Sequence, residues 1–394
     1  MKIAQVSPLY ESVPPQMYGG TERVVSYLTE ELVRQGHEVT LFASGDSQTS
    51  AELIAGTPQA LRLAKCVDPF AHHVRLLELV FQNAARFDVL HFHCDYFHFP
   101  LSRRHARAHV TTLHGRLDLP DLPPLYEEFR EMPLVSISDA QRRPLPEVNW
   151  QATVYHGLPR DLHTLCEKPG DYLAFLGRIS PEKRVDRAVE IARRTGMKLR
   201  VAAKVDPVDR EYFEEQIEPL FKKAGSLVEY IGEVGGKDKD EFLGNASALL
   251  FPINWPEPFG LVMIEAVACG TPVIAFRRGS VPEVMNEGVT GFVVDDVDGA
   301  VRAVGRIGEL SRRRCREVFE QRFSVERMAA DYLTVYRQLV KRPTHDARVL
   351  QVFPPVSRPV GKREKKRLRR AIARETLSLD GTASLPAPRD ASAE

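Results

Sequence analysis

The sequence predicts an α/β protein built from two Rossmann-like, doubly wound domains, and three observations support this prediction. The chain has 394 residues, more than a single hydrophobic core usually organises. Short apolar runs typical of buried strands alternate along it with amphipathic helical stretches. The alternation restarts at Tyr172, after a polar segment at 166–171 that contains Pro169-Gly170. Such alternation is typical of parallel sheets covered by helices on both faces.

The first half opens with an apolar run at 3–6, followed by a loop that ends at Gly19-Gly20. Thr21 is suitably placed to cap a helix, and Gly36 follows where a left-handed residue commonly ends one. A strand is predicted next at 39–43. Further strands are predicted at 88–93, 110–113, 134–137 and 153–155.

The second half repeats the pattern. Strands are predicted at 172–176, 199–205, 228–231, 248–251, 273–276 and 291–294, with helices at 185–194 and 261–268. We therefore predict an N-terminal domain over 1–166 and a C-terminal domain over 170–322. Apolar residues at helical spacing predict a closing helix within 324–340. Residues 342–394 contain a basic run at 361–370, and we expect this tail to be disordered.

Composition argues against several classes of protein. Lys and Arg number 54 against 53 Asp and Glu, a net charge of +1, so a nucleic-acid partner is not expected. The five cysteines are scattered and contain no C-x-x-C pair, which favours a reducing compartment. No segment approaches the roughly 18 apolar residues of a membrane span. We predict a cytoplasmic protein, with peripheral contact of the basic tail at the inner membrane face left open.

The stretch 257–265 places a carboxylate on each side of a helix start. Glu257 belongs to a loop, Gly260 precedes an apolar helix, and Glu265 follows about two turns along. A helix N-terminus offers unpaired N–H groups and a positive partial charge to an anion. Carboxylates can hold the paired hydroxyls of a sugar. The pattern suits a sugar joined to a phosphate, and a helix-start Glu followed by a solvated Glu is the alternative.

Two cations follow the predicted strand that begins the second half. Arg178 and Lys183 lie in the stretch 175–184, in a loop that opens the next helix. In parallel sheets ligands bind beyond the carboxyl ends of the strands, so both side chains are expected to face that region and solvent. Together they could neutralise a diphosphate leaving group. Taken singly, each cation is more often a surface residue.

In this order, the two stretches resemble the C-terminal domain of family 4 glycosyltransferases, the retaining enzymes of the two-domain B-type (GT-B) fold. The motifs are G-R-I-S-P-E-K at 177–183, E-x7-E with P-F-G at 257–265, and A-V-A-C-G-T-P-V-I-A at 266–275. Gly19-Gly20 and T-T-L-H-G at 111–115 resemble N-domain motifs of the family. The resemblance extends to about Tyr336. It implies two domains facing across a cleft, with the closing helix crossing back to the N-domain.

The resemblance implies that four residues take part in the reaction. Arg178 and Lys183 match the pair that binds the donor diphosphate, and Glu257 matches a contact to the donor sugar. His114 matches the N-domain histidine that approaches this sugar. In a front-face retaining transfer the leaving phosphate takes the acceptor proton, so no dedicated base is expected. No metal ion is expected either, because the two cations supply the positive charge that a divalent ion would bring.

Other residues are implied to bind the nucleotide sugar. Glu265 matches the carboxylate that holds the ribose. The backbone is expected to supply the remaining contacts, at Gly19 and Gly20 for the phosphates, at Phe259, Gly260 and Leu261 for sugar and phosphate, and near Ile231 and Val234 for the base. The donor is a substrate, so no separate cofactor is expected.

The resulting hypothesis is transfer of a hexosyl unit from a nucleoside-diphosphate sugar, with a UDP-sugar preferred. The acceptor, a sugar, lipid or small molecule, is not identified. Two alternatives stay open: a sugar-nucleotide epimerase or hydrolase of the same architecture, and a degenerate nucleotide-sugar-binding protein.

Two patterns look like metal sites but are interpreted otherwise. They are Asp296-Val-Asp298, and His91, His93 and His98 with Cys94 and Asp95. The first occurs late in the chain, where acidic helix caps explain it. The second has no fourth ligand at suitable spacing, so buried or cleft-lining histidines are favoured. His93 and Asp95 could instead touch the acceptor.

Overall fold

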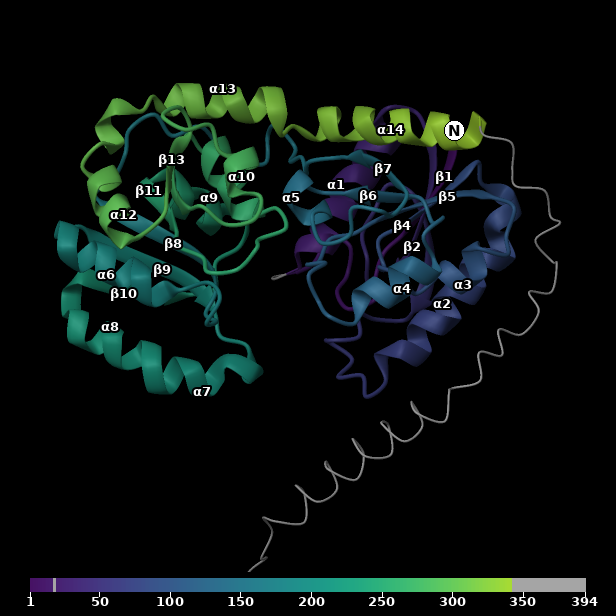
Figure 1. Cartoon of the computed structure of the whole chain (residues 1–394), viewed down its shortest axis with the longest axis horizontal. Coiled ribbons are helices and arrows are strands. Elements are labelled where there is room, and N and C mark those ends of the chain that lie inside the picture. The colour runs from purple at the N-terminus through teal and green to yellow at the C-terminus, as the bar shows by residue number, and fades with distance from the viewer. Residues whose placement is uncertain (17–18, 342–394) are drawn as a thin grey trace, which may run out of the picture. The chain divides into compact units, whose positions relative to one another are not determined.

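The structure, a computed structural model, describes residues 1–16 and 19–341, and the expectation of a disordered tail at 342–394 falls outside this part of the chain (Figure 1). Its first sheet contains β1 (Lys2–Val6), β2 (Glu38–Ser44), β3 (Glu52–Thr57), β4 (Val89–Phe92), β5 (Ala108–Thr112), β6 (Leu134–Ser136) and β7 (Trp150–Thr153). The order is β3-β2-β1-β4-β5-β6-β7, and all pairings are parallel.

A second parallel sheet follows along the chain. Its strands are β8 (Tyr172–Arg178), β9 (Lys198–Lys204), β10 (Val228–Gly232), β11 (Ala246–Phe251), β12 (Val273–Phe276) and β13 (Gly291–Val294). They are arranged in the order β10-β9-β8-β11-β12-β13. The prediction of two doubly wound parallel sheets is confirmed, while the exact domain boundaries stay a prediction.

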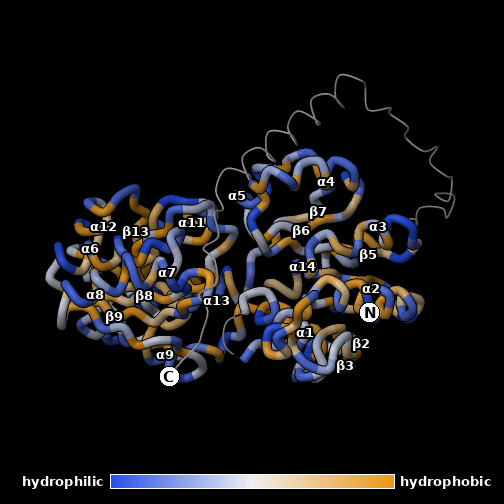
Figure 2. The backbone as a smooth tube through the Cα atoms, turned by 90° about the horizontal axis from the view of Figure 1, so that it is seen from below, coloured by the Kyte–Doolittle hydropathy of each residue, from blue (hydrophilic) through white to orange (hydrophobic). Residues whose placement is uncertain are grey.

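Helices lie between most successive strands, and two further helices follow β13 before the last described helix. They are α1 (Gly20–Arg34), α2 (Pro69–Asn83), α3 (Phe99–Ser102), α4 (Leu122–Glu128), α5 (Asp139–Arg142), α6 (Val185–Thr195), α7 (Arg210–Tyr212), α8 (Glu218–Ala224), α9 (Gly236–Gly244), α10 (Leu261–Ala268), α11 (Val281–Val284), α12 (Val297–Val304) and α13 (Arg312–Arg322). Hydrophobic stretches recur along both halves of the chain (Figure 2). Within the described residues, no helix is both long and apolar enough to cross a membrane.

The strand order places a switch point in each sheet. In the first sheet β1 separates β2 from β4, and in the second β8 separates β9 from β11. Successive connections leave β1 and β8 in opposite directions, which opens a crevice beyond the carboxyl ends of the strands. Ligand sites are therefore expected just after β1 and β4, and just after β8 and β11.

The last described helix, α14 (Val325–Lys341), belongs with the first sheet although it follows the second in sequence. Its buried Tyr332 and Tyr336 pack in one apolar cluster with Val24 of α1 and Val110 of β5. Tyr336 also accepts a hydrogen bond from Gln5 of β1 at 3.1 Å. The implied return of the closing helix to the N-terminal part is confirmed.

Two local expectations were wrong, and one strand was missed. Helix α1 starts at Gly20, so Gly19, rather than Thr21, is its N-cap. The final strand of the first sheet is Trp150–Thr153 instead of 153–155. Strand β3 was not predicted at all. Both strands lie at the edges of the sheet, where fewer side chains are buried and the apolar signal is correspondingly weak.

Candidate functional site

Arg178 is the last residue of β8 and lies at the switch point of the second sheet. Its guanidinium group is surrounded by carboxylates: Nη2 lies 2.6 Å from Glu182, Nε 3.3 Å from Asp209 and Nη1 3.5 Å from Asp206. The charge of Arg178 is therefore compensated locally. A bound diphosphate would have to replace at least part of this acidic shell.

Lys183 and Glu257, from two separate motifs, form an ion pair. The Lys183 Nζ lies 2.6 Å from the Glu257 Oε2, and the Trp255 Nε1 donates to the same oxygen at 3.0 Å. The Trp255 ring lies 4.7 Å from the Lys183 Nζ. These contacts join the end of β8 to the loop before α10.

The expectation that Arg178 and Lys183 face solvent needs correction. Their side chains are only 30% and 20% exposed. Each cation contacts at least one carboxylate, Glu182 for Arg178 and Glu257 for Lys183. The reason is electrostatic: a cation that is partly removed from water is most stable beside a carboxylate of the chain.

Helix α10 begins at Leu261 with Gly260 as its N-cap, and Gly260 has a left-handed φ of 81°. A Cβ built on Gly260 would lie 2.7 Å from the Met263 Cε. A larger residue would therefore be strained both by the left-handed backbone and by this close contact. The first-turn N–H groups of α10 therefore stay close to the Glu257 loop. This arrangement suits an anion.

The first turns of α1 and α10 lie against each other. A Cβ built on Gly20, the first residue of α1, would lie 3.6 Å from the Cδ1 of Leu261. Both helices present their positive ends at this point. Gly19 packs tightly against Pro15, because an added Cβ would lie 2.7 Å from the proline Cβ.

Glu265 of α10 is buried and forms an ion pair with Lys239 of α9, 2.6 Å long. Burial alone would raise the pKa of Glu265. The charge of Lys239, followed by those of His163 and Arg23, outweighs burial and lowers this pKa. Lys239 was missed by the sequence analysis; its position in the helix after Gly235-Gly236 was the available signal.

Gly279 and Ser280 support the Glu257 loop and were also missed. The Ser280 N–H donates to the Glu257 carbonyl at 2.9 Å, and its Oγ donates to the Phe259 carbonyl at 2.9 Å. Gly279 has a φ of 53°, and an added Cβ would lie 2.3 Å from the Glu257 carbonyl oxygen. Only glycine allows this approach without moving the loop.

We predict that Gly279→Ala impairs the function of the Glu257 loop. The methyl group would displace the Glu257 backbone, so turnover should fall at least about tenfold, as expected when a positioned group shifts by about 1 Å. Gly288→Ala is the matched control, because Gly288 has a similar φ of 71° but nothing within 4 Å of an added Cβ. Equal turnover of the two purified variants would contradict this prediction.

His114 follows β5 and is held by other aromatic residues. Its Nε2 lies 2.9 Å from the His93 Nδ1, and its ring stacks on His156 with centroids 5.4 Å apart. The His156 ring contacts Phe259 edge to face at 4.7 Å. Burial lowers the pKa of His114 to about 3, so the imidazole is neutral near pH 7.

Ile231 and Val234 flank the end of β10 and are half-buried. Both pack against the apolar cluster that includes Met263 and Ile264 of α10. The position at the carboxyl end of β10 is compatible with the expected base contacts, which stay a prediction.

The two metal-like patterns have other contacts in the structure. Asp296 Oδ1 accepts a hydrogen bond from the Gly299 N–H at 2.7 Å and caps α12. His91 is buried, with its ring nitrogens 2.6 Å from the Tyr336 hydroxyl and 2.8 Å from the Thr112 hydroxyl. These contacts account for Asp296 and His91.

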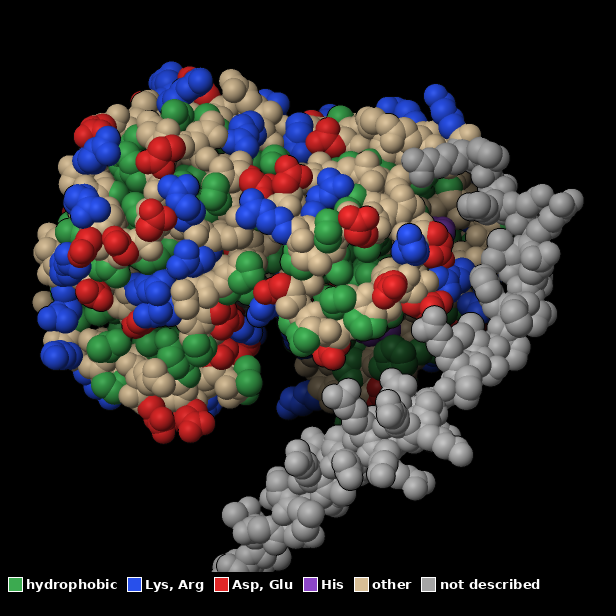
Figure 3. All heavy atoms as spheres, in the orientation of Figure 1, with side chains coloured by type: hydrophobic (Ala, Val, Ile, Leu, Met, Phe, Trp, Pro, Cys, Tyr) green, Lys and Arg blue, Asp and Glu red, His purple; other side chains and the backbone are tan. Residues whose placement is uncertain are grey.

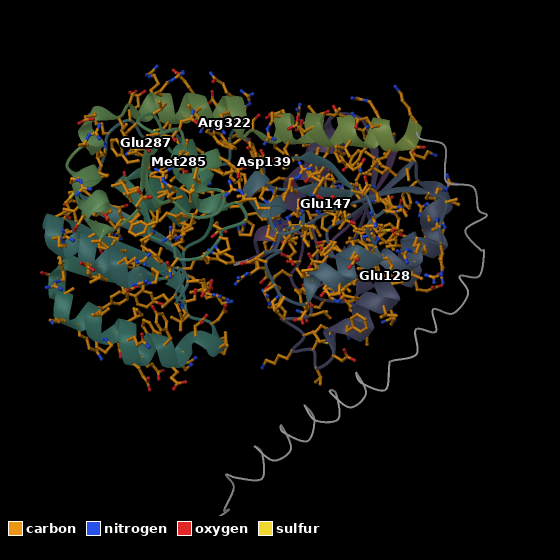
Figure 4. All side chains as sticks on the ribbon, in the orientation of Figure 1. Glu128, Asp139, Glu147, Met285, Glu287 and Arg322 are labelled. Atoms are coloured by element: carbon orange, nitrogen blue, oxygen red, sulfur yellow. The ribbon has the colours of Figure 1, made fainter. Side chains whose placement is uncertain are left out.

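A further contact joins the two halves of the described chain. Glu283 of α11 accepts hydrogen bonds from the backbone N–H groups of Asp139 and Ala140 at 2.7 and 2.6 Å, at the start of α5. Arg322, near the end of α13, donates to the Glu283 carbonyl at 2.6 Å. Figure 4 labels Asp139 and Arg322. Glu283 therefore links α5 to the C-terminal sheet.

We expect Glu283→Ala to weaken this link. Two N–H groups of α5 would lose their acceptor, so the free energy of unfolding should fall by about 1–2 kcal/mol, as for loss of a helix cap. Glu309→Ala, which removes an exposed i,i+3 ion pair, serves as the control. Chemical denaturation of both variants tests this, and equal midpoints would contradict it.

The two parallel sheets and the paired charges at their switch point are typical of the B-type glycosyltransferase fold, and comparisons with known proteins agree. The model of Glycosyltransferase Family 4 matches residues 18–152, and that of Glycosyl transferases group 1 matches residues 165–317. Together the two models cover more than half of the chain, which therefore belongs to the family 4 glycosyltransferases.

Several curated relatives match only parts of the sequence. The chain is 35% identical over 116 residues to N-acetyl-alpha-D-glucosaminyl L-malate synthase of Bacillus anthracis, covering 27% of this chain and 30% of that protein. It is 32% identical over 184 residues to D-inositol 3-phosphate glycosyltransferase of Saccharomonospora viridis, 42% of each. The chain spans less than half the length of the first curated relatives it matches, between 30% and 46%.

Solved structures are similar over most of the chain. AviGT4, a glycosyltransferase involved in avilamycin A biosynthesis, matches with a TM-score of 0.67 and 26% identity, covering 86% of this chain and 98% of that one. Anabaena HepE in complex with UDP-glucose matches with a TM-score of 0.64 and 17% identity, covering 86% and 98%. The second likeness is one of fold alone.

Proposed function

We propose that the protein is a retaining glycosyltransferase that moves a hexosyl unit from a UDP-sugar to a hydroxyl group of an acceptor. One observation carries this proposal: the Lys183–Glu257 ion pair lies beside the N-terminus of α10. A cation suited to phosphate and a carboxylate suited to sugar hydroxyls therefore meet where a helix end also favours an anion. The donor would lie between the regions 1–166 and 170–322.

The donor phosphates would be held by charge. Arg178 and Lys183 would exchange their carboxylate partners for diphosphate oxygens, with the first turns of α1 and α10 adding N–H groups. Glu265 would accept hydrogen bonds from the ribose hydroxyls. Ile231 and Val234 would meet the base through apolar and backbone contacts. The preference for UDP is supported by the likeness to HepE, whose structures contain UDP and UDP-glucose.

The transfer itself would need positioning and charge stabilisation. The bond between the anomeric carbon and the diphosphate oxygen breaks while the acceptor oxygen bonds to that carbon on the same face. Because attack and departure take place on the same face, the configuration is retained, and the acceptor proton passes to the leaving phosphate oxygen. Arg178 and Lys183 stabilise the negative charge that develops on the diphosphate. Glu257 orients the sugar and favours positive charge at the reacting carbon, and the neutral His114 approaches a sugar hydroxyl.

Donor screening tests the proposal. Purified protein is titrated with UDP and GDP by calorimetry, and UDP release from UDP-hexoses is measured with and without candidate acceptors. We expect UDP binding and release that increases with acceptor, unaffected by a chelator because the two cations supply the positive charge. Binding of GDP but not UDP would reverse the donor assignment. Release of UDP that no acceptor increases would favour an epimerase or hydrolase.

A further inference from the structure

A second group of polar and aromatic residues lies at the switch point of the first sheet. Asp95 follows β4 by three residues and has a left-handed φ of 49°, uncommon for a residue other than glycine. By accessible surface the residue is exposed, although the surrounding protein raises the pKa of its carboxyl group to about 6, and among the described residues none donates a hydrogen bond or forms an ion pair to it. Strained backbone of this kind is often retained at ligand sites.

Asp95 is close to the loop after β1. Burial, and then the charge of Asp95, raise the pKa of the Tyr10 hydroxyl. The cation nearest Tyr10, Arg62, already forms an ion pair with Glu11 at 2.9 Å and lies over the Tyr10 ring at 5.9 Å. The surroundings of Asp95 are therefore acidic or neutral, and an anionic ligand would be repelled.

A row of aromatic rings leads away from this carboxylate. Tyr10 contacts His73 with centroids 4.9 Å apart, His73 contacts Phe97 at 5.4 Å, and Phe97 contacts Phe70 at 5.7 Å. Tyr10 lies near Asp95, and Phe97 is two residues from it in sequence, so the row starts beside this carboxylate and ends at Phe70. Tyr96, between them, contacts Phe97 at 5.6 Å.

The row ends on an exposed apolar surface. Leu63, Val67, Phe70 and Val74, which we call the apolar strip, are 44%, 99%, 59% and 50% exposed. They fall within twelve residues at the start of α2. Charged side chains of both signs are interspersed over the face shown in Figure 3. A cluster of large exposed apolar side chains on such a charged protein marks a contact surface.

We propose that Asp95 and the apolar strip form the acceptor site, and that the acceptor is a neutral sugar joined to an apolar chain. The hydroxyls of the sugar bind the free carboxylate of Asp95, and the chain follows Phe97 and Phe70 to the strip. This inference rests on the proposed function, because it assigns the second substrate of the same reaction. A free carboxylate favours hydroxyl donors over phosphates. A bound apolar chain would remove its surface from water by lying against the apolar strip, and this burial favours binding.

Matched acceptors test the proposal with the full chain and UDP-glucose as donor. Methyl and octyl glycosides of glucose, galactose and mannose are compared below the concentration at which octyl glycosides form micelles. Glucose 6-phosphate is the anionic comparison. We expect kcat/KM to be at least tenfold higher for an octyl glycoside than for its methyl partner, the gain from burying about two methylene groups. A preference for glucose 6-phosphate, or equal use of octyl and methyl glycosides throughout the panel, would overturn the proposal.

Variants separate the two parts of the site. Val67→Ser with Phe70→Ser should abolish the octyl advantage, whereas Asp95→Ala should reduce the use of octyl and methyl glycosides alike by about tenfold or more. Val208→Ser, which removes an exposed apolar side chain near the second sheet, is the control. If the strip variants instead altered only the oligomeric state in sedimentation, the strip would be a contact between copies and the proposal would be wrong.

A readout independent of transfer distinguishes this inference from the proposed function. Octyl glucoside should slow hydrogen exchange across residues 63–74 in the wild type, and methyl glucoside should not. If UDP binds by calorimetry but octyl glucoside gives no protection, the acceptor assignment fails alone. If UDP does not bind, the proposed function fails, whatever the exchange data show.

Discussion

Lys183→Ala and Arg178→Ala should each lower the transfer rate by roughly 10² or more, the scale of losing one electrostatic stabiliser of a developing negative charge. In the structure both cations are held by carboxylates, so neither is needed to fill a core. The folded state should therefore survive. Removing Lys183 leaves the buried Glu257 without its cation, so a loss of stability is expected for this variant.

The control for this prediction is Lys198→Ala, which removes an exposed cation of β9. Turnover is measured under saturating donor, and circular dichroism checks that each variant is folded. Near-normal turnover of folded Lys183→Ala or Arg178→Ala would contradict the phosphate role of that residue.

The second large effect separates Glu257 from Glu265. Glu257→Gln keeps the size of the side chain and removes the charge that holds Lys183. Lys183 would then be free to bind phosphate, so affinity for UDP should be equal or higher. Turnover should fall by about 10² or more, because the carboxylate no longer favours positive charge at the reacting carbon.

Glu265→Ala should act in the opposite way. Its interaction with the ribose would be present before and during transfer, so its loss should mainly weaken nucleotide binding. The variant also leaves Lys239, whose side chain is 14% exposed, without its carboxylate partner. The double variant Glu265→Ala with Lys239→Ala removes this complication. If Glu257→Gln lost UDP binding in calorimetry while Glu265→Ala retained it, the two roles would be reversed.

Much of the fold was predictable because the strands are short and buried. The inner strand β12 is a continuous apolar run, and β4 departs from one only at His91, since both faces of a parallel sheet are covered. The edge strand β3 is only half-buried along most of its length, and its sequence lacks that signal. The edge strand β7 was misplaced for the same reason.

The site was predictable as motifs but not as contacts. Lys183 and Glu257 are 74 residues apart, and only the parallel order β8-β11 brings the ends of their strands together. The sequence patterns also gave no sign of Gly279. Its importance depends on the Glu257 carbonyl oxygen, which would lie 2.3 Å from a Cβ added at this position. Lys239 was missed because a lysine on a polar helix resembles a solvated residue until its partner is known.

The central claim, that the Lys183–Glu257 region binds the donor, is tested most directly by a crystal structure of the protein with UDP-glucose. We predict that the Lys183 Nζ leaves Glu257 and that the Arg178 guanidinium leaves Glu182, both moving onto diphosphate oxygens in front of the first turn of α10. Glu265 should then contact the ribose. UDP-glucose bound elsewhere, or bound here with both ion pairs intact, would contradict the account.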